Sequence, residues 1–545
     1  MRVYRKFALT LVLCMFAAQV SYAYNQDTWG ELDFLQLERD SPFLNSEEGY
    51  AEQTLNVTFA PPPLTYGIRA WDERAPVGLG ETLRRGLVAG GYSVMKNTLL
   101  MYFNMTFLQS PWTAPTVDTI QRNLGGPSNW QWENKDGFIV NHIGHPFQGS
   151  IYFSAGRATG FGFYGSAFFN VFGSVTWEVF HEGLTASIND MLITAPAGMS
   201  LGEILFRLYL QGHSAGVPAP LLFIFNPAAG LHRLVTGWEP PAVERNLYEF
   251  RAHLGVGYTS VDYSIYSSAH PLVPDGRTDV FSDTGLFFDV GLHVIYGDPF
   301  AQSTWVPFRH FEFLVSAGTD LMRHTDFRIF SNGYLFSFSP LRAETRALST
   351  GLSLFMDVAI VAGLDHKGGF EQIGGLYQSG TINMYSNALG WSLKYRHLFS
   401  PSVGLRSRLH AGFTFFGASH FYHPVYDPEL EQIERANYGY GISLRHLSSL
   451  ELGRRSRFDI NNFVYFQWTF PGIGEISRGF VWWQFHDFTF SHLVSQRISL
   501  GATFSLAMER GRFEGFPDTR KNHWSVRAFV AWNGNNIRAP IEGRR

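Results

Sequence analysis

The sequence contains almost no cysteine and few charged residues for its length. Its 545 residues include one cysteine, Cys14, and Asp, Glu, Lys and Arg make up 16% of the chain, where soluble domains average about 25%. A single cysteine excludes a disulfide framework. The net charge is −4 and no long basic run is present, so nucleic acid is not an expected partner.

Common catalytic motifs are also missing. The chain has no Gly-x-Ser-x-Gly nucleophile elbow, no Walker phosphate loop and no dinucleotide-binding fingerprint. Any catalytic activity would therefore need a site that these patterns do not describe.

Aromatic residues and glycine are abundant instead. Phe, Tyr and Trp make up 16% of the chain, with 55 glycines, yet the mean hydropathy is only −0.06. A soluble protein would have to bury nearly all of these rings, and a helical membrane protein would be far more apolar. A transmembrane β-barrel satisfies both observations, because one face of each strand meets lipid and the other a polar lumen.

The first 23 residues resemble a secretory signal. Basic residues at positions 2–6 precede an apolar stretch over 7–20, and small residues precede an expected cleavage after Ala23. Cleavage there removes Cys14 and leaves no thiol in the mature chain. The alternative is a lipoprotein anchored at Cys14, and the bulky Leu13 before it argues against that anchor.

The rest of the chain divides by composition into four regions. The expected regions are an extended polar arm over 24–79, a helical domain over 80–237, a β-barrel over 244–537 and a tail over 538–545. Within the helical domain, apolar runs and breakers predict helices over 81–108, 142–160, 161–182, 199–211 and 219–234, with a short turn over 187–191.

One predicted helix could also be a membrane span. Residues 161–179 are nearly uncharged and long enough to cross a bilayer. Their Gly, Ser, Asn and Thr content favours a buried core helix, and small residues in this domain would let helix backbones approach closely.

Two-residue alternation after Pro241 predicts the barrel strands. Leu286, Phe288 and Val290 share one face, and Asp289 and Gly291 share the other. The second face carries Gly, Ser, Thr, Arg and His with little Lys, which suits a narrow lumen rather than open water. The same alternation recurs over 250–258, 348–360, 403–415, 458–468, 498–506 and 524–532.

These patterns predict an α+β multidomain protein, with an N-terminal helical domain followed by a closed antiparallel transmembrane β-barrel of about 12 strands. The expected location is the bacterial outer membrane, and the expected partners are its lipid and the barrel-insertion machinery, although the chain continues for 13 residues past Trp532. A soluble secreted β-protein is the alternative that the Gly-rich second face argues against.

A set of motifs within the helical domain resembles a known family. In order, they are Asn141-His142-Ile143-Gly144-His145-Pro146, Trp177-Glu178, Glu182, Ser187-Ile188-Asn189-Asp190, Gly202-Glu203 and Asn226-Pro227-Ala228-Ala229-Gly230. Over about residues 120–236, this is similar to the bacterial envelope family catalogued as domain of unknown function 3943. The resemblance implies an exported envelope protein with a following β-rich part, and it implies no known activity.

Several residues of these motifs are of types that bind metal. The candidate ligands for Zn, Mn or Fe are His142, His145, Glu178 and His181. Glu182 and Asp190 are candidate catalytic acid or base residues.

The alternative is a polar network that fixes helix packing, in which Arg157, Ser187 and Glu203 take part. Because only one Glu-x-x-His pair occurs where a di-iron bundle needs two, we favour the network, with no cofactor.

The lumen face offers a second group of candidates. Positive side chains there could favour anionic solutes: Arg251, His253, Arg406, Arg408 and Arg497. Ordinary charge pairing with Asp289, Asp357 and Asp459 is the alternative that we favour.

The resulting functional hypothesis is a non-enzymatic outer-membrane barrel with its helical domain at the periplasmic mouth, in solute passage or envelope structure. The alternative hypothesis is an envelope hydrolase that acts on lipid or peptidoglycan fragments and uses the His and carboxylate cluster.

Overall fold

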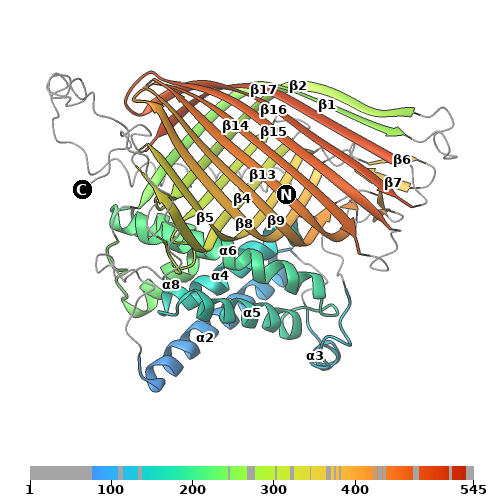
Figure 1. The fold of residues 1–545 in the computed structure, drawn as a ribbon. Helices are drawn as coiled ribbons and strands as arrows, with labels where there is room; N and C mark the ends of the chain where they lie inside the picture. The colour runs from blue at the N-terminus through green and yellow to red at the C-terminus, as the bar shows by residue number, and fades with distance from the viewer. Residues whose placement is uncertain are drawn as a thin grey trace.

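The computed structural model consists of a helical block and a β-barrel that lie side by side (Figure 1). It describes residues 77–108, 114–132, 138–243, 246–266, 277–300, 303–319, 325–343, 345–363, 370–373, 376–379, 382–419, 422–423, 426–427, 432–433, 437–453, 455–470, 478–514 and 518–534. The predicted signal peptide, nearly all of the predicted arm and the predicted tail lie outside these residues.

The helical block contains four long helices and several shorter ones. The long helices are α2 (Leu79–Phe103), α4 (His145–Ala158), α5 (Phe163–Phe180) and α6 (Ile188–Ser214). The shorter elements are η3 (Asn104–Leu108), α3 (Val117–Leu124), η5 (Val140–Gly144), α7 (Ala219–Phe225) and α8 (Pro227–Thr236).

Twelve antiparallel strands close into a barrel, which confirms the predicted architecture and strand number. The wall strands are β1 (Leu247–Tyr266), β2 (Arg277–Tyr296), β3 (Phe311–Thr319), β4 (Thr325–Arg342), β5 (Arg346–Gly363), β8 (Ile382–Ser400), β9 (Val403–Ser419), β13 (Asn437–Leu452), β14 (Ser456–Thr469), β15 (Gly479–Leu493), β16 (Ile498–Phe513) and β17 (Asp518–Asn533). Five short strands lie between them: β6 (Phe370–Ile373), β7 (Leu376–Ser379), β10 (Tyr422–His423), β11 (Tyr426–Asp427) and β12 (Gln432–Ile433).

The first and last strands close the ring. β1 pairs with β17 from Arg251 opposite Asn533 to Tyr266 opposite Asp518. Short links such as 401–402 and 494–497 join the strands at the end where β1 starts and β17 finishes, and we call this the turn end. The opposite end, which carries the long connections 364–381 and 420–436, is the loop end.

The wall separates a polar interior from an apolar exterior. On β1, Arg251 and His253 line the lumen, while Leu254 and Val256 are exposed on the outer face. Outward apolar side chains are likewise exposed on strands β13 to β17, as at Ile442, Phe490 and Val526. This is the distribution of a transmembrane barrel, in which the exterior meets hydrocarbon.

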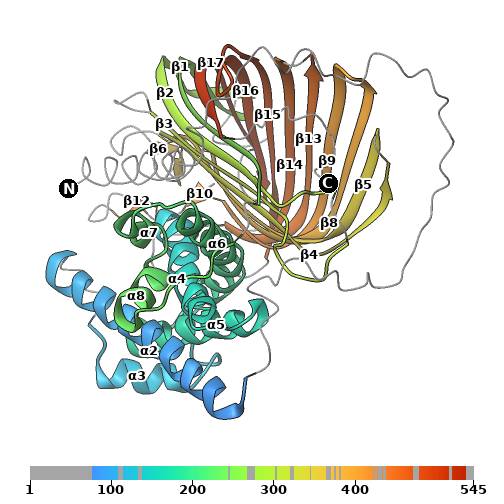
Figure 2. The ribbon, with the colours of Figure 1, turned by 90° about the vertical axis from the view of Figure 1, so that its left-hand side faces the viewer.

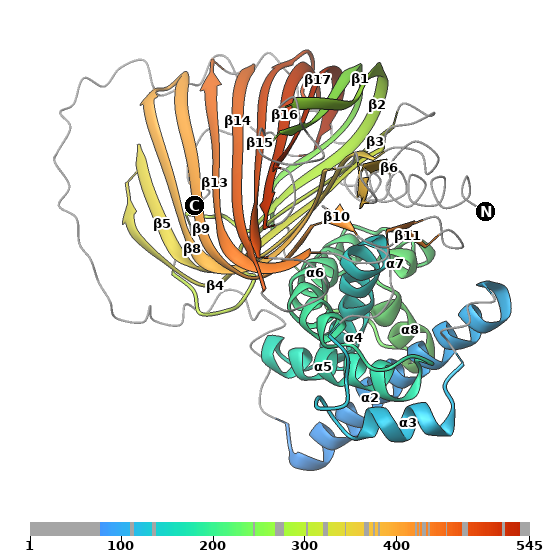
Figure 3. The ribbon, with the colours of Figure 1, turned by 90° about the vertical axis from the view of Figure 1, so that its right-hand side faces the viewer.

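The helical block packs against the outer face of this wall. Leu201 and Leu205 of α6 belong to one buried cluster with Val294, Val315 and Phe327 of strands β2, β3 and β4. Figures 2 and 3 show the block beside the barrel in both views. We expected this domain at one mouth of the barrel, and its contacts with the described strands lie along the outside of the wall.

Helix α6 crosses the whole wall from rim to rim. Near its start, the Asn189 side chain donates to the Tyr438 hydroxyl at the loop end, where β13 begins. In its middle, the Ser200 and Ser331 hydroxyls lie 2.8 Å apart, and Ser331 is on the outer face of β4. Near its end, Arg207 donates to the Pro307 carbonyl in the β2–β3 connection at the turn end.

The sequence predicts this helix only in part. We expected a short turn and then a helix from residue 199, but one helix runs through Pro196. A proline inside a helix removes one backbone hydrogen bond, and packing on both faces of α6 offsets that loss. Helix α3 was not predicted; it begins at a capping box made by Thr116 and Thr119.

Among the described helices, α6 has the length and composition to cross a membrane, and 72% of that apolar stretch is buried in the protein. The barrel wall covers one side of it and helices α4 and α5 cover the other.

Glycines let the helices approach closely. A Cβ atom at Gly198 would lie 2.6 Å from the backbone of Gly149, so α4 and α6 meet at these two positions. Gly173 likewise lies against the Tyr152 ring. This confirms the expected close packing of small residues.

Candidate functional site

Three buried carboxylates meet where α5 ends and α6 begins. Glu178, Glu182 and Asp190 each place an oxygen atom within 4.8 Å of the others, and all three side chains are buried. We call this group the carboxylate cluster. Carboxylates this close are stable together when they share protons or face a cation, because like charges repel strongly in a buried site.

His145 adds a nitrogen ligand beside this cluster. It is the first residue of α4, and its Nε2 lies 3.6 Å from Oδ1 of Asp190. The next residue, Pro146, tolerates the first turn of a helix because it has no N–H to leave unbonded. Three carboxylates and one imidazole suit Mn or Fe, and also Zn.

The two other predicted histidine ligands make further contacts. The Nδ1 of His142 donates to the Phe138 carbonyl at 3.0 Å, and its ring lies 4.8 Å from the Tyr385 ring on the barrel wall. His181 turns toward α2, where its Nε2 is 3.1 Å from the Thr98 hydroxyl. The Glu-x-x-His pair therefore does not form one binding face, because α5 ends at Phe180 and His181 is its cap.

Buried ion pairs join Arg157 and Glu203, two of the residues proposed for a packing network. Arg157 pairs with Glu203 at 2.9 Å, and Arg207 pairs with Glu203 at 2.7 Å. These three side chains form the arginine triad, which ties α4 to α6 inside the block.

Ser187 supports the carboxylate cluster. Its backbone N–H donates to Oε2 of Glu178 at 2.8 Å, and its hydroxyl bonds the Asn189 side chain. Because Asn189 also bonds Tyr438, the cluster is linked to the loop end of the barrel wall.

Ion pairs line the lumen, as the charge-pairing interpretation proposed. Arg251 lies 3.5 Å from Asp459, and His253 lies 2.9 Å from Asp289. Arg408 pairs with Glu312 at 2.8 Å. Arg497 differs from the other predicted lumen residues because it lies in the turn between β15 and β16, where its carbonyl accepts from the Asn533 N–H.

Two further ion pairs cross the full width of the barrel lumen. Arg406 on β9 reaches Glu249 on β1 at 3.2 Å, and these strands are six places apart in a ring of twelve. Arg328 on β4 reaches Asp487 on β15 at 3.5 Å, again six places apart. We call these two pairs the lumen bridges.

A cavity of about 160 Å³ lies among the lumenal side chains. Arginines and aspartates line it together with aromatic rings, including Arg251, Asp289, Phe330 and Arg445. A space of this size holds about one small ring-sized molecule.

Several of these residues were missed from the sequence, although simple patterns mark them. Glu249 directly precedes the predicted strand over 250–258, and two-residue alternation places it on the same lumenal face as Arg251 and His253. Arg207 follows Glu203 by four residues, which places both on one helix face. Tyr438, by contrast, pairs with a residue 249 positions earlier, and no local pattern indicates that contact.

Part of the helical block matches a family model. Residues 129–221 match the family described as Domain of unknown function (DUF3943). The matched range includes His145 and the carboxylate cluster. No curated protein matches the chain.

Solved barrels show a distant likeness. The Pseudomonas putida toluene transporter TodX is 9% identical, and the match covers 53% of this chain and 90% of that protein, with a TM-score of 0.22. An outer-membrane channel from Pseudomonas putida F1 is 10% identical over 51% of this chain and 95% of that protein, with a TM-score of 0.25. The outer-membrane channel DcaP of Acinetobacter baumannii is 10% identical over 52% and 96%, with a TM-score of 0.19.

Proposed function

We propose that the barrel carries small solutes across the bacterial outer membrane. The observation that supports this most directly is a polar lumen with an internal cavity inside a closed wall whose exterior is apolar. Bacterial barrels have short periplasmic turns and longer outer loops, so the turn end would face the periplasm. Barrel-insertion machinery and outer-membrane lipid would then be the expected partners.

Passage through this lumen would require the lumen bridges to open. Both bridges span opposite strands, and the Glu249 carboxylate also receives Arg457 from β14 at 2.7 Å. Buried ion pairs are weakly screened by salt, so ordinary ionic strength would leave them closed. We therefore expect a channel of low conductance that opens in response to a solute or another signal.

Removing one bridge should raise conductance. In planar bilayers, Glu249→Ala should open more often than the unaltered protein, because Arg406 and Arg457 lose their shared partner. Arg512→Ala is the matched control, since it breaks an exposed ion pair with Asp518 at the loop end and leaves the lumen unchanged.

Equal current through Glu249→Ala and the control would contradict gated passage. Silence from every variant would favour a role in envelope structure instead. Heat-modifiable migration in detergent gels confirms in each case that the barrel is closed.

A second candidate is the envelope hydrolase, and the carboxylate cluster with His145 favours it. In that function the carboxylate cluster and His145 would hold a divalent metal, which would supply Lewis-acid activation of water, and one of the carboxylates would accept a proton from that water. Lipid or peptidoglycan fragments are the substrate classes that we propose for it.

Metal analysis of the purified full-length protein tests this candidate. We expect one equivalent of Mn, Fe or Zn, lost in Glu182→Gln and retained in Glu81→Gln, which changes an exposed carboxylate on α2. Metal-free protein after supply of all three ions would remove the support for hydrolysis.

A further inference from the structure

Between residues 138 and 232, the helical block has its charged side chains inside and apolar side chains on its surface. Residues 138–232 contain only six Asp, Glu, Lys or Arg side chains, and all six are buried: Arg157, Glu178, Glu182, Asp190, Glu203 and Arg207. A water-soluble domain of this length would carry about four times as many charges, mostly on its surface.

The exposed faces of the block are correspondingly apolar. On α5, Tyr164 and Phe168 are exposed, the latter by 63%, and no charged side chain of that helix reaches the surface. On α2, Leu87, Leu99 and Tyr102 are exposed along most of the helix length. A contiguous apolar surface of this kind marks a face that meets lipid or another protein.

The charges of α2 lie where the helix begins or point inward. Glu81 accepts hydrogen bonds from Arg84 and Arg85 in the first turns, so these three charged side chains form one ion-paired group at this end of the helix. After Arg85, the one remaining charge is Lys96, whose Nζ lies 3.3 Å from the Tyr152 hydroxyl inside the block.

The block covers the same apolar band that other strands expose. Register pairs join Tyr385, Val358, Ile329, Val315 and Leu292 in one outward row beneath the block. The row continues across β1 and β17 through Ala252 and Trp532.

Outward side chains of a single strand also differ in exposure, according to whether the block covers them. On the outer face of β2, Leu286 is 59% exposed, while Leu292 is 3% exposed because the block covers it. The block therefore covers part of an apolar outer face whose remainder is exposed.

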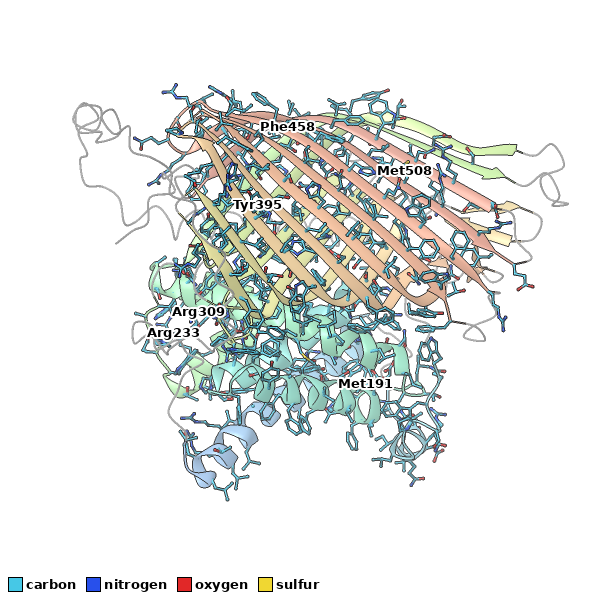
Figure 4. The ribbon with its side chains drawn as sticks, in the orientation of Figure 1. Met191, Arg233, Arg309, Tyr395, Phe458 and Met508 are labelled. Atoms are coloured by element: carbon cyan, nitrogen blue, oxygen red, sulfur yellow. The ribbon has the colours of Figure 1, made fainter. Side chains whose placement is uncertain are left out.

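Helices α2 and α6 have the length of membrane spans, and α6 also has the direction of one. α6 runs from the loop end to the turn end, and α2, with 25 residues, is about 37 Å long. In Figure 4, Arg233 of α8 lies near the turn end and Met191 of α6 near the loop end, so the block extends along the barrel. A hydrocarbon core is about 30 Å thick.

We propose that the helical block lies within the lipid bilayer beside the barrel, with α2 and α5 facing acyl chains. The Gly149–Gly198 contact and the internal arginine triad agree with this, because membrane helices pack through small residues and keep ionised groups in the bundle interior. The location does not depend on whether the barrel conducts.

Site-directed spin labelling tests this location in the full-length protein. The only native cysteine lies in the predicted signal peptide, so single cysteines can be placed at will. Labels at Phe168→Cys and Leu99→Cys test the exposed faces of the block. A label at Val526→Cys is the reference for a lipid-facing position, and a label at Arg84→Cys is the reference for a water-exposed position. Each labelled protein is reconstituted in phosphatidylethanolamine–phosphatidylglycerol vesicles, and relaxation by oxygen is compared with relaxation by a water-soluble nickel chelate.

We expect Phe168→Cys and Leu99→Cys to match Val526→Cys, with an oxygen-to-nickel ratio several-fold higher than at Arg84→Cys. Ratios equal to that of Arg84→Cys would place the block in water and overturn the proposal. Labels that neither reagent reaches would show that a protein covers these faces, which also overturns it. All four positions are exposed, so the substitutions leave packing intact.

Discussion

Glu203 joins two arginines in the polar interior of the block. It is fully buried and receives two guanidinium groups, from Arg157 and Arg207. Removing one member of a buried ion pair leaves charge uncompensated, which costs about 3–5 kcal/mol.

We therefore expect Glu203→Gln to lower the stability of the block by an amount in that range, measured as the midpoint of urea unfolding followed by the helical circular dichroism signal. Glu81→Gln, at an exposed carboxylate, is the control and should leave the midpoint nearly unchanged. An unchanged midpoint for Glu203→Gln would mean that the triad contributes nothing to folding.

At the residue scale, the sequence identified the polar groups of the block better than their partners. His145, Glu178, Glu182 and Asp190 are buried near one another, and their family motif marked all four. His181 is turned away because the last turn of α5 ends before it. A helix end is set by competing caps, which a spacing rule of three or four residues does not describe.

At the scale of elements, α4 and α6 approach each other closely through glycines. A Cβ atom at Gly198 would overlap the backbone of Gly149, so the helices would have to move apart. At Gly91, on the open face of α2, nothing lies within 4 Å of the same added atom.

The same substitution at these two glycines should have opposite effects. Gly198→Ala should destabilise the block by about 1–3 kcal/mol through overpacking. Gly91→Ala should be neutral or stabilising by up to about 1 kcal/mol, since alanine favours helix. Thermal unfolding of both variants in detergent measures the difference, and equal shifts would show that the α4–α6 crossing is loose.

The strands were predicted more faithfully than the helices. Period-two alternation reports directly which face meets lipid, so residues 250–258 and 524–532 appear within β1 and β17. Helix limits were less certain, because α6 is apolar on both sides of Pro196 and the apolar periodicity has no single face to follow.

At the scale of the whole molecule, the sequence predicted the two parts and their order, and confirmation came from the closed ring of twelve strands. How the two parts meet could not be predicted. Contacts such as Ser200 with Ser331 and Asn189 with Tyr438 join positions more than a hundred residues apart, and they form only when both parts are folded.

Seven wall strands form the surface that receives α6: β2, β3, β4, β5, β8, β9 and β13. All seven follow the helices in the chain. The helical segment therefore precedes in the chain every strand that covers it. Until those strands have folded, the apolar side chains of α6 lack their cover, so we expect the segment to need protection by a chaperone or by the forming barrel while the protein assembles.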